Sequence, residues 1–235
     1  MTFHDPDLPP PGSGRREKKI ERKREILDAA SRVFRRRGVQ GAGMREIAAE
    51  LGMTVGNLYY YFENKQSLLA FCQQDGLDGL LRLYRELQAQ DLPPEQRLHR
   101  LITGHVRHLN EGTPGSLAHL EVDGLEGAFR SRILERRSEY ERAIRSLIED
   151  GIAGGAFRPI DAKVATLAIL GAMNWTVRWY RPGGERSARE IGSDFAEMLV
   201  RGLLAPHHPG LADPGLPPAD SAHPAAPSAR NDERT

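Results

Sequence analysis

The sequence predicts an all-α fold, and three observations support that prediction. Apolar residues recur every three to four positions through most of residues 17–204, which is the spacing of a helix with one buried face. Glycine and proline lie between these stretches, where helices are expected to end. The alternating apolar and polar residues of a half-buried strand, followed by a hairpin turn, are not found.

The N-terminal part is predicted to form one long helix and two short helices joined by a glycine turn. The first helix spans residues 17–37, with an apolar stripe of Ile26, Leu27, Ala30, Val33 and Phe34. The second has apolar residues at positions i, i+3, i+4 and i+7, namely Met44, Ile47, Ala48 and Leu51. Gly52 ends this helix because glycine adopts a left-handed backbone at little cost, and the Thr54 hydroxyl caps the next helix.

The third helix presents polar and aromatic side chains on its outward face. Leu58 and Phe62 are four residues apart and are predicted to pack on the second helix. The side chains predicted to point elsewhere are Asn57, Tyr60 and Tyr61, with Tyr59 on the boundary. Such a face is consistent with ordinary helical packing, but exposed aromatics also indicate a contact surface. Asparagine pairs with adenine and tyrosine hydroxyls donate to phosphates, so the alternative is a helix that reads DNA.

The charge distribution favours the DNA-binding alternative. Residues 15–65 contain thirteen basic and seven acidic residues, which gives this segment a net charge of +6. The whole chain carries +1, so the remainder carries −5. A basic segment in an otherwise acidic chain is typical of a protein that binds nucleic acid at one end. Asn64 and Lys65 begin the next helix, and a helix N-terminus with a lysine is a predicted phosphate site.

The rest of the chain is predicted to form further helices. They are expected at 65–89, 95–111, 115–124, 127–154, 161–180 and 187–204. Residues 164–177 are apolar nearly all round, but a membrane span needs about 20 residues. We therefore expect this segment to be buried on two sides, by its own domain and by a second copy of the chain. The last helix has the apolar stripe Ile191, Phe195, Met198, Leu199 and Leu203, so a four-helix interface between two copies is predicted.

The composition of the two ends indicates the domain boundaries, and the single cysteine bears on the cellular location. Residues 1–14 and 206–235 are rich in proline and small or polar residues, and both are predicted to be disordered tails. Between them we expect one domain at 15–66 and a second at 67–205. Cys72 is the only cysteine, so an internal disulfide is excluded. Together with the lack of a secretion signal, this favours a cytoplasmic location.

The string LGMTVGNLYYYFENKQSLL, with the helices before it, resembles the recognition region of TetR-family transcriptional repressors. The resemblance covers about residues 25–70 and includes Phe34, Gly38, Ile47, Ala48, Gly52, Leu58, Tyr59, Phe62 and Lys65 in the expected order. It implies DNA contacts by Thr54, Val55, Gly56, Asn57, Tyr59, Tyr60, Tyr61 and Lys65, to which we add the basic residue Arg45. Two positions depart from the family pattern. Gly43 replaces a capping Ser or Thr, and Val55 replaces a polar residue and suits a thymine methyl.

A second string, NWTVRWYRPGGERSAREIGSDFAEMLVRGL, resembles the C-terminal region of a TetR subgroup that senses acyl-coenzyme A thioesters. This resemblance implies that residues 67–205 bind a ligand and dimerise, with arginines for phosphates and tryptophans for the acyl or thioester end. The implied ligand residues are Arg130, Arg132, Arg136, Arg137, Trp175, Arg178 and Trp179. The tryptophans are equally consistent with core or dimer contacts, and the arginines with a solvated helix face.

These resemblances imply a homodimeric transcriptional repressor, without catalysis, that binds a palindromic DNA operator. A small-molecule effector, expected to be an acyl-CoA thioester, releases it. One alternative is a TetR-type regulator of hydrophobic drug-like ligands, although the aromatic content is only 6%. A weaker alternative is an α-helical metal-dependent hydrolase, suggested by His99, His105, His108, His119, Glu121 and Asp123. These residues lack the HExxH spacing, so we expect no enzymatic activity, metal or cofactor, and prefer histidines facing a ligand cavity.

Overall fold

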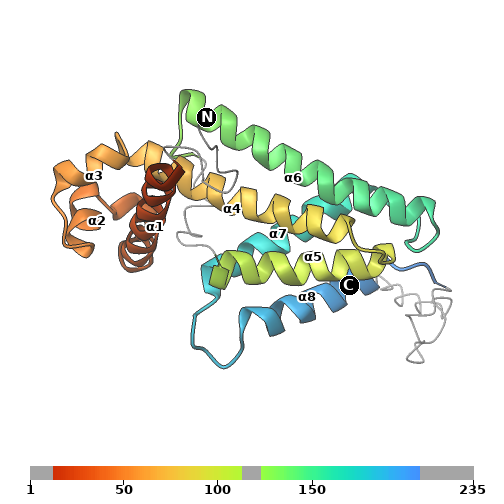
Figure 1. Ribbon diagram of the computed structural model, residues 1–235. Coiled ribbons are helices and arrows are strands. Elements are labelled where there is room, and N and C mark those ends of the chain that lie inside the picture. Colours follow the sequence, from red (N-terminus) through yellow and green to blue (C-terminus); the bar gives the residue numbers. More distant parts are fainter. Residues whose placement is uncertain (1–12, 113–122, 207–235) are drawn as a thin grey trace, which may run out of the picture.

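The computed structural model describes residues 13–112 and 123–206, and these parts of the chain are helical (Figure 1). Within them an isolated antiparallel bridge joins Phe157 to Leu204, and no strand is present. The predicted all-α fold is therefore confirmed for the described residues. The two predicted tails and the predicted helix at 115–124 lie almost entirely outside these ranges. Residues 13 and 14 were expected in the N-terminal tail, but they begin the first helix instead.

Three helices form a head at one end of the molecule. They are α1 (Ser13–Gly41), α2 (Met44–Glu50) and α3 (Val55–Tyr61). Gly38, with a φ of 72°, makes a kink near the end of α1, and Gly52, with a φ of 62°, ends α2 as the sequence predicts. The predicted Thr54 cap is also confirmed, because its side chain accepts a hydrogen bond from the Asn57 N–H. These two signals fix the turn that presents α3.

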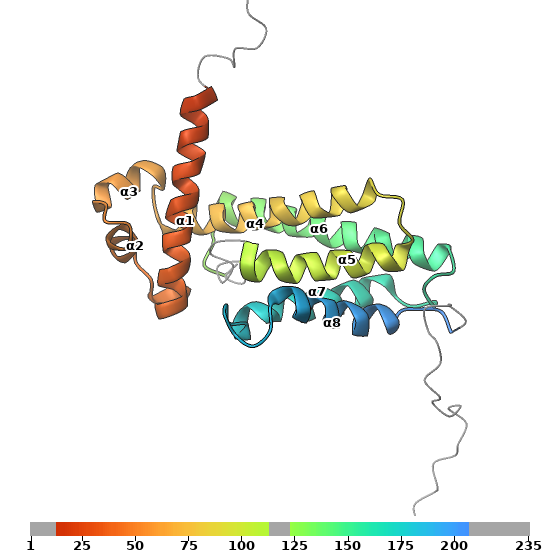
Figure 2. The same cartoon turned by 60° about the horizontal axis from the view of Figure 1, so that its bottom comes forward.

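Five further helices form the body, and α4 leads into it from the head (Figure 2). They are α4 (Lys65–Gln88), α5 (Pro94–Arg107), α6 (Gly127–Ala153), α7 (Ala162–Trp179) and α8 (Ala188–Arg201). A π-helical turn, η1 (His108–Gly112), extends α5. The predicted helices match these elements closely, because caps and prolines mark their starts: Asn64, Asp161 and Ser187 all accept hydrogen bonds from first-turn N–H groups.

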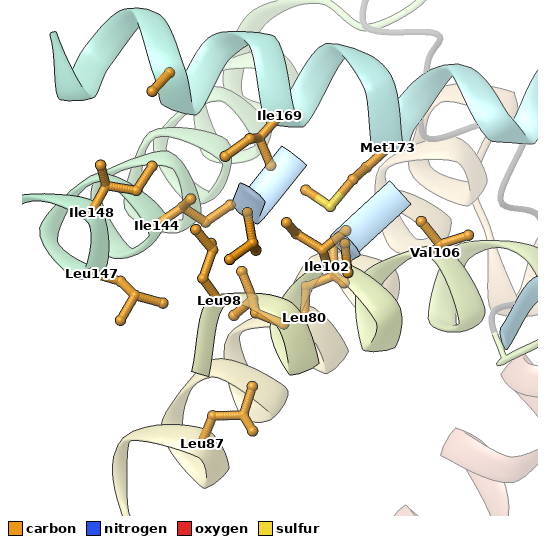
Figure 3. Packing of buried hydrophobic residues seen from close by; sticks show 14 of the residues in the cluster. Leu80, Leu87, Leu98, Ile102, Val106, Ile144, Leu147, Ile148, Ile169 and Met173 are labelled. Carbon is orange, nitrogen blue, oxygen red and sulfur yellow. The ribbon is translucent and has the colours of Figure 1, made fainter. Parts of the chain in front are cut away.

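The buried apolar side chains form two clusters, one in the head and one in the body. Figure 3 shows the body cluster, in which Leu98 and Ile102 of α5 face Ile144 of α6 and Met173 of α7. The head cluster joins α1, α2 and α3 to residues of α4 and to two residues beside or within α6, Leu125 and Ile133. Cys72 of α4 is buried in this head cluster. Burying each such Leu or Ile contributes about 1.5–3 kcal/mol. Because some of these residues belong to α4 and α6, the head core depends on helices that continue into the body.

Helix α8 packs closely on α5 at one glycine. A Cβ added to Gly192 would lie 3.0 Å from the backbone oxygen of Thr103 and 3.1 Å from its Cα. Backbone atoms cannot move aside as a flexible side chain can, so this position requires glycine. The close approach holds the last helix against the centre of the body.

One face of α7 is apolar but exposed in the single chain. Its inward side chains, among them Ile169 and Met173, are buried in the body cluster. On the other side Val164 is 59% exposed and Trp175 is 63% exposed. The sequence predicted burial of this segment on two sides, and within one chain only the inner side is covered. No helix in the described parts of the chain has the length and apolar character to cross a membrane.

Candidate DNA-binding surface and ligand cavity

Helix α3 presents two large aromatic side chains to solvent. Leu58 is fully buried in the head cluster, which sets the orientation of the helix. On the opposite side Tyr60 is 65% exposed and Tyr59 is 47% exposed. Tyr61 is half-buried, and its ring lies edge-on to that of Tyr60 at a centroid distance of 5.0 Å. Exposed tyrosines on a short helix form a surface suited to phosphates and base edges.

The other predicted DNA-contacting residues surround this helix. Thr54, Gly56 and Asn57 are exposed at its start, whereas Val55 is half-buried. Arg45 is exposed on α2. Lys65 opens α4, and its Nζ donates to the backbone oxygen of Gln40 at 3.1 Å. These residues thus occupy one end of the head.

The basic residues of α1 divide into two groups. Near its N-terminal half, the Lys19 ammonium lies 5.3 Å from the centre of the Tyr60 ring, so this part of α1 borders the exposed face of α3. Further along, Arg32 donates to Glu50 at 2.7 Å, and Arg36 donates to the same carboxylate. Hydrogen bonds from Arg36 and then Arg32 lower the pKa of Glu50 to about 2. These arginines tie α1 to α2, so part of the positive charge of the head is neutralised internally.

A cavity of about 310 Å³ lies in the body and opens to its surface, where Leu134 and Leu167 are exposed, and we call it the body cavity. It is bounded by α4, α5, α6 and α7, and is lined by Leu77, His105, Leu134, Arg137, Ser138, Tyr140, Glu141, Lys163, Leu167, Leu170 and Asn174. Four leucines give it an apolar wall. The other seven lining residues are polar or charged, and an apolar wall combined with polar groups is typical of a small-molecule site.

A hydrogen-bonded chain of three side chains runs along one wall of the body cavity. The Tyr140 hydroxyl lies 3.0 Å from His105 Nδ1, and His105 Nε2 lies 3.2 Å from Asn174 Oδ1. Burial lowers the pKa of His105 to about 3, so the imidazole is neutral at physiological pH. Its Nε2–H then donates to Asn174, and its Nδ1 accepts from Tyr140. The wall is a fixed array of neutral polar groups.

Of the seven predicted ligand residues, Arg137 lines the body cavity. Its guanidinium donates to Gln73 Oε1 at 3.2 Å, and burial lowers its pKa to about 10, so it remains charged. Arg136 points elsewhere and pairs with Asp78 and, at 2.6 Å, with Glu139. Arg130 is exposed, and Arg132 lines a separate hollow beside Lys23 of the head.

The three predicted ligand residues of α7 lie outside the body cavity. Trp179 lines a surface hollow, with its ring 6.3 Å from that of Phe195. Arg178 lines a different cavity, next to α1. Trp175 is exposed on the apolar face of α7. The seven residues are therefore distributed over several surfaces and are not gathered in one cavity of this structure.

Histidines were predicted to face a cavity, and His105 does so. Its partners Tyr140 and Asn174 were not predicted, because they lie on different helices far along the chain. The helical register could have placed Tyr140 on the buried side of α6, but not opposite a histidine. Among the described residues no three metal-binding side chains lie together, and His119 and Glu121 fall outside them.

Two family models match the chain. One, described as bacterial regulatory proteins of the tetR family, matches residues 26–71, which include α2 and α3. The other, described as the tetracyclin repressor-like C-terminal domain, matches residues 91–203, which include α5 to α8. The chain belongs to the TetR family. The resemblance read from the sequence is thereby confirmed, and this TetR-family protein is a DNA-binding transcriptional regulator and not an enzyme.

Named relatives support the same assignment for this TetR-family chain. The HTH-type transcriptional repressor KstR2 of Rhodococcus jostii (strain RHA1) is 29% identical over 204 residues, covering 86% of this chain and 100% of that protein. The fatty acid metabolism regulator protein of Bacillus subtilis (strain 168) is 22% identical over 182 residues, covering 76% of this chain and 94% of that one. The similarity thus extends through both head and body.

Solved structures of TetR-family proteins have the same fold. The ketosteroid transcriptional regulator KstR2 of Mycobacterium tuberculosis superposes with a TM-score of 0.71 at 26% identity, covering 78% of this chain and 95% of that one. AibR in complex with isovaleryl coenzyme A and operator DNA gives a TM-score of 0.67 at 27% identity, covering 76% and 98%. At least one protein of this fold therefore binds both DNA and a coenzyme A thioester.

Proposed function

We propose that this TetR-family protein is a dimeric repressor that a small-molecule ligand releases from a palindromic operator. Each chain places α3 in the DNA major groove, and the ligand occupies the body cavity. The ligand favours a different separation of the two recognition helices and so weakens DNA binding. Linkage requires that DNA weakens ligand binding by the same factor.

One observation carries this proposal: the helices that line the body cavity also form part of the head core. Leu77 of α4 belongs to the head cluster and lines the body cavity. On α6, Ile133 is buried in the head cluster, while the next residue, Leu134, lines the cavity. A ligand that displaces α4 or α6 therefore displaces residues on which the head is built. Packed cores convert small shifts into discrete rearrangements, which makes such coupling effective.

The DNA contact is assigned to the exposed side of α3 and its neighbours. We propose that Tyr59, Tyr60 and Asn57 meet the duplex, with Arg45 and Lys65 on flanking phosphates. Thr54, Val55, Gly56 and Tyr61 complete the predicted contact set. A helix in the major groove with flanking cations on the backbone is the usual arrangement of helix-turn-helix proteins. Because these contacts lie on the head and the cavity lies in the body, we propose a DNA-binding domain at 15–66 and a ligand-binding and dimerisation domain at 67–205.

The chemistry of the body cavity favours an acyl-CoA thioester as the ligand. Its leucine wall suits an acyl chain, and the neutral chain of Tyr140, His105 and Asn174 offers polar partners for a carbonyl. Arg137 and Lys163 supply positive charge for the anionic coenzyme. In support, the similar protein AibR forms a complex with isovaleryl coenzyme A, and a Bacillus subtilis relative is named a fatty acid metabolism regulator protein.

The exposed face of α7, with Met198 of α8, is the proposed dimer interface. Val164, Leu167, Trp175 and Met198 are large apolar residues exposed in the single chain. Large apolar residues exposed on one helix are typical of an association site. Two copies related by a two-fold axis would bring four helices together and present two α3 helices to one duplex.

The test is a fluorescence-anisotropy titration of a labelled duplex from the promoter beside the coding sequence. We expect salt-sensitive binding by the dimer, and release on adding acyl-CoA but not free coenzyme A. Release by hydrophobic dyes instead would favour the drug-like alternative. Lack of affinity for this duplex and for random promoter fragments at low salt would reject the proposed function.

A further inference from the structure

Helix α1 begins well before the first buried residue of the head, and we call residues 13–25 the α1 extension. The buried residues of the head cluster begin at Ile26. The family model of the DNA-binding region also begins at residue 26. Within the α1 extension Ile20 is the single large apolar residue, and it is 41% exposed. Packing of the head core therefore does not account for these first turns of α1.

Most of the positive charge of the head lies in the α1 extension. It has seven basic and three acidic residues, a net charge of +4, whereas residues 26–65 have six basic and four acidic residues, a net charge of +2. In that second segment three arginines are paired with carboxylates of α2. Two arginines of the extension, Arg22 and Arg24, also have carboxylate partners. Lys18 and Lys19 are exposed, and in the described parts of the chain no carboxylate lies within ion-pair distance of either.

Cation–π contacts hold the α1 extension beside α3. The Lys19 ammonium lies 5.3 Å from the centre of the Tyr60 ring. One turn later, the Lys23 ammonium lies 4.9 Å from the ring centre of Phe62 and 4.8 Å from that of Phe71. Lys23 therefore connects α1 to the end of α3 and to α4. This connection places Lys19 at the edge of the exposed tyrosine face.

The α1 extension points away from the proposed dimer interface. Figure 2 shows α1 projecting beyond the rest of the head on the side opposite α8. Because α7 and α8 carry the proposed interface, the partner copy would lie on the other side. A dimer that presents two α3 helices to one duplex would therefore direct both extensions outward along the DNA, away from the two-fold axis.

We propose that the α1 extension binds DNA phosphates on the outer flank of each operator half-site, with Lys18 and Lys19 as the contacts. A lysine ammonium is a point charge that binds phosphates without reading bases, so this contact adds affinity but no sequence preference. The proposal rests on the proposed contact between α3 and the operator. The α1 extension lacks an apolar face, so an anionic membrane surface is not the favoured partner.

The test measures the affinity of the full-length protein for the labelled promoter duplex over a series of salt concentrations. Each phosphate contact contributes about 0.9 to the slope of log affinity against log salt concentration, so Lys19→Gln in both chains of a dimer should lower the slope by about 1.8. Adding Lys18→Gln should lower it by about twice as much. Lys19→Arg keeps the charge and should keep the slope. Glutamine is a good helix former, so the extension should stay helical.

Hydroxyl-radical footprinting locates the lost contacts. The double variant should lose protection at both outer ends of the site and keep protection at its centre. Arg142→Gln combined with Arg189→Gln removes the same charge from exposed positions of α6 and α8, and should match the wild type in slope and footprint. An unchanged slope in the double variant, or a lower slope with unchanged ends of the footprint, would overturn the proposal. A wild-type protein that binds no duplex would instead reject the proposed repressor function, and this inference with it.

Discussion

Tyr60 and His105 have opposite roles: Tyr60 is available to a partner, and His105 stabilises the fold. Tyr60 lies outside the head core, so its side chain is available to a partner and adds little to the folded state. His105 lies in the interior, where it is neutral and hydrogen-bonded at both ring nitrogens. The first residue can be changed without cost to the fold, whereas the second cannot.

Replacing Tyr60 with phenylalanine should weaken operator binding without destabilising the protein. The exposed hydroxyl is proposed to donate to a DNA phosphate, and a hydrogen bond to a charged group contributes about 1.5–3 kcal/mol. We expect a loss of roughly tenfold or more in an anisotropy titration. Tyr84→Phe removes a hydroxyl that accepts from Gln88 at 2.6 Å in the body, and should bind normally. Unchanged affinity in Tyr60→Phe would show that its hydroxyl does not contact DNA.

The stability of the protein should fall in acid because of His105. Its pKa is about 6.5 in an unfolded chain and about 3 in the folded protein. Below pH 6.5 the unfolded chain binds a proton that the folded protein does not, so stability is lost as the pH falls from 6.5 toward 3. Linkage gives a loss of about 2 kcal/mol between pH 7 and pH 5.

Urea unfolding at pH 7 and pH 5 measures this loss. In His105→Gln the protein should be less stable at pH 7, but its further loss at pH 5 should be smaller by about 2 kcal/mol. His99→Gln, on the half-buried side of the same helix, serves as the control. An equal pH dependence in the two variants would contradict the assignment of the acid loss to His105.

At the level of helices, the sequence predicts the features that depend on residues close together in the chain, such as caps and turns. Thr54 and Gly52 mark the turn of the head because a cap hydroxyl and a left-handed glycine act within four residues of the chain. The π-helical turn after α5 was not predicted, and no residue type among His108–Gly112 requires it. The predicted four-helix interface stays a prediction, since the described structure is one chain.

The contact between α5 and α8 should be sensitive to one methyl group. In Gly192→Ala the added Cβ would meet the Thr103 backbone at 3.0 Å, and overpacking of this kind costs about 1–3 kcal/mol. The gain in helix propensity, about 1 kcal/mol, offsets only part of that cost. A lower melting temperature is expected. Gly56→Ala, where nothing lies within 4 Å of the added Cβ, should melt at or above the wild-type temperature.

For the whole molecule, the predicted DNA-contacting residues lie together on the head, whereas the predicted ligand residues do not lie in one cavity. The predicted DNA residues follow one another along two short helices, so one local pattern placed them together. The positions of the predicted ligand residues depend on how α6 and α7 pack. Arg137 lines the body cavity, whereas Arg178 lines a different cavity next to α1. Because these ligand residues lie on helices far apart in the chain, no local sequence pattern predicts which of them come together.

A charge on the exposed face of α7 should break the proposed dimer. Val164→Asp places a charge in the proposed interface and should convert the dimer to monomers in sedimentation-velocity runs, with a loss of operator affinity. Ile20→Asp changes an exposed apolar residue of α1 in the same way and should leave the dimer intact. A dimer that persists in Val164→Asp would place the interface on another face.

The single cysteine has a practical consequence. Cys72 is enclosed by the head cluster, and burial raises the pKa of its thiol, so it does not react readily with maleimides or methanethiosulfonates. A second cysteine introduced at an exposed position of α1 would therefore accept a spin label alone, without removal of the native one. With one label on each copy, the distance between the two labels would report the separation of the two heads. Pulsed electron resonance could then record how the spacing of the two labelled sites responds to each candidate effector.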